Sequence, residues 1–167
     1  MLKDQLIKLK ACSEAVEWVG KRSLAKVWRD CQRADWMLWY LHKTDCDRKL
    51  LVKATCACAR TALKYVPRGE LRPLRAIETA EAWTQGEATL DQVKTAASAA
   101  YAACAVYAAD AVALGATSAA YFATSAASSL AAPYVAYAVS AAAKQRSHKE
   151  MSDIIRSIIP EPMSIKK

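Results

Sequence analysis

The sequence predicts an all-α protein, a single-domain bundle of about seven or eight helices with an alanine-rich C-terminal half. The first indication is composition, since only four of the 167 residues are Gly and five are Pro, and these residue types are the poorest helix formers. The second is alanine, the best helix former, which takes about half of the positions from 96 to 143. The third is the three- and four-residue spacing of apolar side chains along most of the chain.

Polar residues and a glycine mark the ends of the first helices. Apolar residues at helical spacing run over 2–19, where Ser13 is well placed to begin a second helix and Gly20 to end it. Ser23 is expected to cap a short helix from Leu24 to Cys31, because its hydroxyl can accept a hydrogen bond from a free backbone N–H in the first turn.

Two aspartates are predicted to cap the next two helices. Asp35 precedes the run 36–41, which is apolar on every face and is therefore expected to be buried or covered by a partner. Asp45 is expected to cap a long helix that continues to about Val66 and ends at the following Pro67.

Proline, glycine and threonine divide the second half into further helices. Pro73 fits the first turn of a helix over 74–85, and Gly86 fits its end. Thr89 is expected to cap the helix that follows.

This next helix is expected to run from 90 to about 114, where Gly115 breaks it. Further helices are predicted over about 117–131 and from Pro133 to just before Pro160.

The length of the chain suits one domain that buries its core without disulfides or metals. We expect this domain to cover 1–159 and a loose tail to cover 160–167. In the alanine-rich part, small residues around large ones let helix axes approach closely. Ala105 and Ala109 are therefore expected to lie in tight helix contacts.

The net charge of +8 favours association with nucleic acid, an anionic membrane surface or an acidic protein. Basic and acidic residues alternate in most segments, so a solvated surface with a modest positive excess is the simplest interpretation. The pattern closest to a nucleic-acid-binding stripe is a set of basic residues at helical spacing around one tryptophan: Lys21, Arg22, Lys26, Arg29 and Trp28.

A membrane span is not expected in the nearly uncharged stretch 95–143. It consists mostly of Ala, Ser, Thr and Tyr rather than Leu, Ile and Phe, and Gly115 and Pro133 interrupt it. Its one charged residue, Asp110, is expected to be a buried carboxylate paired with an arginine or a tyrosine hydroxyl; the alternative is a group that faces a ligand.

The six cysteines show no pattern of export or metal binding. No signal peptide is recognisable at the N-terminus, so we expect reduced thiols and a cytoplasmic location. Cys56 and Cys58 are two apart on a predicted helix and face about 200° apart, so they cannot share an ion. His42 and Cys46 have ligand spacing, but Asp45 interrupts the helix between them. We therefore predict no metal and no cofactor.

No set of residues has the spacing of a catalytic site, and we do not expect an enzyme. His148 lies among basic residues on an expected solvated face. Glu78 and Glu81 could be compared with a pair of glycosidase carboxylates, but Arg72 and Arg75 are equally close in sequence. A salt-bridged helix surface explains these four residues more simply.

The chain resembles a known family over six stretches and over the alanine-tyrosine run that precedes the last of them. In chain order, the six stretches are 12–19 (CSEAVEWV), 33–39 (RADWMLW), 56–60 (CACAR), 72–83 (RPLRAIETAEAW), 86–89 (GEAT) and 153–160 (DIIRSIIP). Together they resemble the all-helical immunity proteins encoded beside bacterial polymorphic toxins and in phage genomes. That family often shows Gly-Asp where this chain has Ala34 and Asp35. Its arginine corresponds to Arg72 or Arg75.

The resemblance implies a protein that binds a toxin, or a host or defence protein, and neutralises it by occlusion. We therefore expect a protein partner and no membrane association. The alternative is a basic nucleic-acid-binding or phage accessory protein. The candidate binding residues are Arg33, Asp35, Arg72, Arg75, Glu78 and Glu81. For Arg75 a structural role also stays open, as an inward-pointing partner of Asp110.

Overall fold

The structure, a computed structural model, describes residues 1–44, 46–106, 120–121, 125–127 and 148–162. In this part of the chain the regular elements are helices, and the all-α prediction is confirmed. The described elements are α1 (Leu2–Lys8), α2 (Ser13–Val19), α3 (Leu24–Asp30), α4 (Ala34–Lys43), α5 (Arg48–Arg60), the 3-10 helix η1 (Leu63–Tyr65), α6 (Arg72–Gln85), α7 (Leu90–Val106) and α10 (His148–Ile158).

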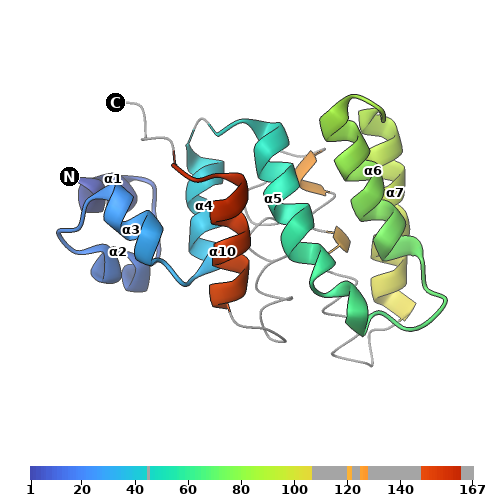
Figure 1. The fold of residues 1–167 in the computed structure, drawn as a ribbon, viewed down its shortest axis with the longest axis horizontal. Coiled ribbons are helices and arrows are strands. Elements are labelled where there is room, and N and C mark those ends of the chain that lie inside the picture. Colours follow the sequence, from blue (N-terminus) through green and yellow to red (C-terminus); the bar gives the residue numbers. More distant parts are fainter. Residues whose placement is uncertain (45, 107–119, 122–124, 128–147, 163–167) are drawn as a thin grey trace.

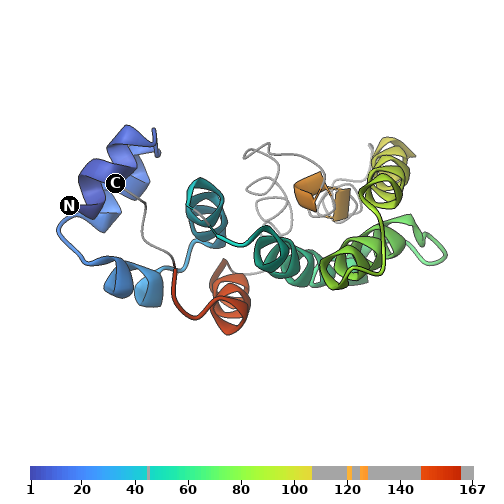
Figure 2. The same cartoon turned by 90° about the horizontal axis from the view of Figure 1, so that it is seen from above.

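The helices form an elongated arrangement with the three short N-terminal helices at one end (Figure 1). Helices α5, α6 and α7 pack in chain order toward the other end. The C-terminal helix α10 does not follow this order, because it packs against both α4 and α5 (Figures 1 and 2). The end of the chain therefore joins the N-terminal third to the middle of the molecule.

Several helix ends lie where the sequence predicts them. The Ser23 hydroxyl accepts a hydrogen bond from the backbone N–H of Lys26 at 3.4 Å. The Thr89 hydroxyl accepts one from Gln92 N at 3.2 Å, and the Gln92 side chain accepts one from Thr89 N at 2.7 Å. Gly86 ends α6 with φ of 86°, in the left-handed region that glycine adopts without a steric cost.

The prediction that Asp35 caps α4 is wrong. The helix begins at Ala34, its N-cap residue is Arg33, and Asp35 lies in the first turn. The reason is that the Asp35 carboxylate pairs with the Arg33 side chain instead of with backbone N–H groups.

The predicted bounds of the next helix, from Asp45 to about Val66, are also wrong. Helix α5 has Asp47 as its cap, whose carboxylate accepts a hydrogen bond from Leu50 N at 3.0 Å, and Asp45 lies outside the described residues. The helix ends at Arg60. The Thr61 hydroxyl donates to the Cys58 carbonyl at 2.7 Å, which gives that oxygen a partner as the chain tightens toward η1.

The core of the described residues runs through the row of helices. Its largest fully buried side chains come from α4, α5, α6, α7 and α10: Met37, Leu38, Leu41, Val52, Thr55, Ile77, Val93, Met151 and Ile155. Trp36 and Trp39, in the run that is apolar on every face, stay partly exposed. The expectation of burial is therefore met on one side of α4 only.

Alanine allows close packing where α7 meets α6, as its small side chain predicts. Ala97, Ala100 and Ala103 of α7 are buried, whereas Ala105 is exposed, so the expectation for Ala105 is wrong. Because α7 is described only to Val106, several predictions lie outside the described residues: those for Ala109, Asp110 and Gly115, most of the helix over 117–131, and the helix from Pro133 up to the start of α10.

None of the described helices combines the length and apolar character needed to cross a lipid bilayer. All six cysteines are free thiols, and Cys12 is the exposed one. The boundary after residue 159 stays a prediction, and residues 163–167 of the predicted tail lie outside the described part of the chain.

Candidate functional site

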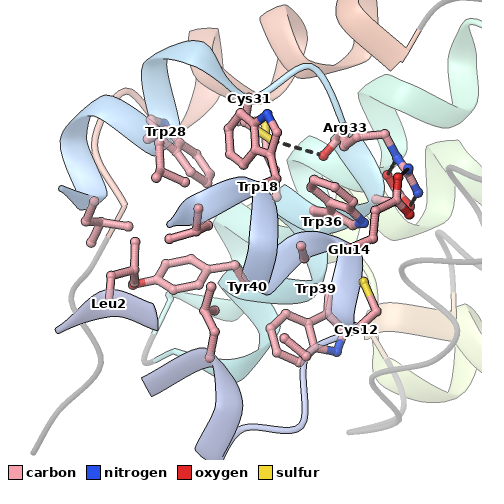
Figure 3. A pocket seen from close by; sticks show the side chains of 18 of the residues that line it. Leu2, Cys12, Glu14, Trp18, Trp28, Cys31, Arg33, Trp36, Trp39 and Tyr40 are labelled. Carbon is pink, nitrogen blue, oxygen red and sulfur yellow. Dashed lines mark hydrogen bonds and ion pairs between the residues drawn. The ribbon is translucent and has the colours of Figure 1, made fainter. Parts of the chain in front are cut away.

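A pocket of about 540 Å³ lies among α1, α2, α3 and the first turns of α4 (Figure 3). Pockets that hold small ligands or anchoring side chains have volumes of about 300–1,000 Å³. Its lining is mainly aromatic and aliphatic: Leu2, Leu6, Trp18, Val19, Leu24, Val27, Trp28, Trp36, Met37, Trp39 and Tyr40. We call this feature the tryptophan pocket.

The tryptophans reach the pocket from three helices. Trp36 and Trp39 are three residues apart on α4 and therefore share a face. Trp18 comes from α2, and its ring centroid lies 5.9 Å from that of Trp36, with the planes tilted by 56°. Trp28 of α3 is 4% exposed and donates its indole N–H to the Ile159 carbonyl at 3.2 Å. Trp28 is thus a fixed part of the core, whereas the other three rings keep an accessible surface.

Arg33 forms a charged edge of this pocket. Its Nε and Nη2 donate to the two carboxylate oxygens of Asp35 at 3.0 and 2.8 Å, and Nη1 donates to Glu14 at 3.3 Å. The hydrogen bonds to Asp35 raise the pKa of Arg33 above its ordinary value. The guanidinium also lies 4.5 Å from the ring centroid of Trp36. Three contacts therefore hold one arginine in place beside the aromatic rings.

His148 belongs to the same cluster, although the sequence suggests a solvated face for it. Its Nδ1 lies 3.5 Å from an oxygen of Asp35, and within the described residues this buried nitrogen has no hydrogen-bond partner. The start of α10 thus lies beside the start of α4.

One further cation lines the tryptophan pocket, and another lies against one of its rings. Lys10 lines it and is exposed. The Arg22 guanidinium lies 4.4 Å from the ring centroid of Trp18. Neither side chain forms an ion pair with a carboxylate in the described part of the chain. Their charges are therefore available to a ligand.

The other predicted binding residues lie away from this pocket, on α6 near the opposite end of the molecule (Figure 1). Arg72, Arg75 and Glu78 line a shallow groove between α6 and α7. Arg72 forms a salt bridge with Glu70, with Nε 2.8 Å from the carboxylate. Arg75 and Glu78 are exposed.

Glu81 connects two helices instead of pairing with an arginine of its own helix, α6. Its carboxylate accepts two hydrogen bonds from Arg60 of α5, at 2.8 and 2.5 Å. This pairing raises the pKa of Arg60 above its ordinary value. The six predicted residues therefore lie in three places. Arg33 and Asp35 are at the tryptophan pocket, three residues line the α6–α7 groove, and Glu81 links α6 to α5.

The described residues include no group of three or more His, Cys, Asp or Glu side chains placed to hold a metal ion. Cys56 and Cys58 are both buried on α5. Burial raises the pKa of Cys58 to about 12, and raises that of Cys56 as well. Because the thiolate is the nucleophile and the metal ligand, these two cysteines act as small apolar core residues.

No protein-family model, curated protein or solved structure matches this chain. The class of the protein is given by its own geometry: an all-α protein with an aromatic pocket edged by arginine and lysine. A fold by itself does not specify a function, which depends on the residues of the site.

The sequence patterns predict Arg33 and Asp35 as binding residues but not the tryptophans that surround them. The signal that points to these tryptophans is the run 36–41, which has no polar face and is therefore expected to be buried or covered by a partner. The tryptophan of the suspected nucleic-acid stripe, Trp28, is buried and cannot stack on a base. Trp18, on the neighbouring helix α2, is partly exposed.

Proposed function

We propose that the protein binds another protein through the tryptophan pocket and inhibits it by covering its active surface. The observation that supports this function is the arrangement of Trp18, Trp36 and Trp39, three partly exposed rings around one cavity beside Arg33. Tryptophan, tyrosine and arginine are the residues that dominate binding hot spots, and such hot spots fill pockets. An immunity protein or a related inhibitor acts in this way.

The pocket is arranged before a partner arrives. Asp35 and Glu14 hold the Arg33 side chain, and Trp36 packs beneath it. A side chain that is already ordered loses little conformational entropy on binding, where ordering a flexible one costs about 0.5–1.5 kcal/mol. This favours tight binding by a small interface.

Nucleic-acid binding is the second candidate, and one contact favours it. Arg22 stacks on Trp18 at the pocket edge, and the chain carries a net charge of +8. Arginine and aromatic rings together make a platform for single-stranded nucleic acid. However, the rings of Trp18 and Trp36 are tilted by 56° to each other, so they do not offer parallel surfaces to a flat base.

The test uses the product of the gene adjacent to this one as the candidate partner. Binding is measured by calorimetry for the parent protein, for Trp36→Ala and for the control Trp83→Ala, whose tryptophan lies on α6 outside the pocket. We expect Trp36→Ala to weaken binding about 30-fold or more, as hot-spot truncations do, and Trp83→Ala to change it little. Binding that both variants leave unchanged would overturn the proposal.

Salt dependence separates the two candidate functions. Between about 50 and 200 mM salt, a nucleic-acid complex with many phosphate contacts loses about 10³–10⁵ in affinity. We expect a far smaller loss for the protein complex, because its affinity comes mainly from buried aromatic side chains. Tight binding of single-stranded DNA with the steep dependence would favour the alternative.

A further inference from the structure

The interior of the tryptophan pocket is predominantly apolar. Besides the aromatic rings, its walls are aliphatic side chains of α1, α2 and α3: Leu2, Leu6, Val19, Leu24 and Val27. Two polar groups in this lining already have partners. The Trp28 indole donates to the Ile159 carbonyl, and the Cys31 thiol donates to the Arg33 carbonyl at 3.5 Å. Burying a polar side chain among these walls costs hydration, a cost that an apolar side chain does not carry.

The edge of the pocket has the opposite character, because it carries unpaired positive charge. Arg33 is neutralised by Asp35 and Glu14, whereas Lys10 and Arg22 have no ion-pair partner among the described carboxylates. The surrounding segment 1–44 is basic as well, with nine Lys and Arg against five Asp and Glu. Such a surface attracts acidic partners and repels basic ones.

We infer that the tryptophan pocket takes a large apolar side chain from an acidic segment of its partner, with flanking carboxylates against Lys10 and Arg22. This inference rests on the proposed function and specifies the chemistry of the partner. The apolar side chain supplies contact area between the tryptophan rings. The carboxylates provide selectivity, since a basic segment with the same side chain would meet like charges at the pocket edge.

The test uses synthetic peptides of twelve residues and the full-length protein. The first peptide has a central Leu-Phe pair flanked by Asp and Glu; the second replaces every acid by Lys; the third replaces Leu-Phe by Ala-Ala. A twelve-residue oligothymidine is the fourth probe. Binding is followed by tryptophan fluorescence in the Trp83→Phe protein, whose remaining tryptophans all line the pocket.

A second readout is the alkylation rate of Cys12, an exposed thiol that lines the same pocket. We expect the acidic Leu-Phe peptide to bind saturably, to protect Cys12, and to bind at least tenfold more tightly than the other two peptides. Lys10→Glu and Arg22→Glu should each weaken it severalfold. The control Lys53→Glu changes an exposed lysine of α5 outside the pocket and should leave binding unchanged.

The outcomes distinguish this inference from the proposed function. If the lysine peptide binds as well as the acidic one, or if no peptide saturates, the inference is wrong. The proposed function then still stands if the neighbouring gene product binds in a manner sensitive to Trp36→Ala. Preferential binding of oligothymidine overturns both. Circular dichroism melting of each variant shows that lost binding is not lost folding.

Discussion

Arg156 donates a hydrogen bond from Nη1 to the backbone oxygen of Trp28 at 2.9 Å, although 128 residues separate them. The same nitrogen donates to the backbone oxygen of Cys31 at 2.8 Å. Both oxygens lie at the C-terminal end of α3, where helix carbonyls lack partners within the helix. Helix α10 therefore holds the connection between α3 and α4, and with it the Trp28 side of the tryptophan pocket.

Replacing Arg156 with Ala should lower the free energy of unfolding by about 2–4 kcal/mol. The change removes two charge-assisted hydrogen bonds, each worth about 1.5–3 kcal/mol, and water that reaches the two carbonyls offsets part of this loss. Urea unfolding followed by circular dichroism measures the loss. The control is Arg29→Ala, which removes an arginine from a surface ion pair and should change stability by about 0.5 kcal/mol or less. Similar losses in both variants would contradict this account.

Cys12 should be the one thiol that reacts rapidly in the folded protein. It is exposed, whereas Cys46 is half-buried and Cys31, Cys56, Cys58 and Cys104 are buried. Burial raises the pKa of Cys31, Cys56 and Cys58, which lowers the fraction of reactive thiolate. Titration with a chromogenic disulfide reagent should show one fast thiol, lost in Cys12→Ser, and six thiols in urea. Several fast thiols in the native protein would show that the core opens readily.

Ala100→Leu should destabilise the protein by about 1–3 kcal/mol, because overpacking forces helices apart where they approach closely. Ala100 is fully buried on α7, which packs against α6. Ala105→Leu is the matched control on the same helix, since Ala105 is exposed. Thermal melting of the two variants tests the difference. Equal melting temperatures would mean that α7 does not pack tightly at Ala100.

Arg75→Glu should leave the melting temperature almost unchanged. Arg75 is exposed in the groove between α6 and α7, so a new carboxylate there stays hydrated. If this groove extends the partner surface, the same variant should slow association. A loss of several kcal/mol on thermal melting would instead indicate that Arg75 points inward to a carboxylate such as Asp110, since two acids would then share a poorly solvated place.

Acidification should destabilise the protein through His42. Partial burial lowers the pKa of His42 below its ordinary value of 6.5, so the unfolded chain binds the proton more readily than the folded one. The free energy of unfolding should therefore fall as the pH drops below about 6.5, by at most about 1.4 kcal/mol per pH unit. Urea unfolding at pH 7.5 and pH 5.5 measures this fall. His42→Gln should reduce this fall in the free energy of unfolding. If the fall is as large in that variant as in the parent protein, other groups cause it.

The all-α class and several helix ends follow from local sequence patterns. Ser23, Gly86 and Thr89 act where predicted because capping depends on backbone groups within about four residues of the cap. Asp35 failed as a predicted cap because a neighbouring arginine competes for its carboxylate. Local patterns therefore predict a helix end well only where no other side chain competes for the capping group.

The positions at which the candidate binding residues meet depend on how the helices pack. Trp18 and Trp36 face each other from two helices, His148 lies beside Asp35, and Glu81 pairs with Arg60 rather than along its own helix. Periodicity along a chain shows which face of a helix is apolar, but not which other helix that face packs against. The pairing of helices depends on the shape and charge of side chains from segments distant in sequence. In this protein that pairing forms the tryptophan pocket.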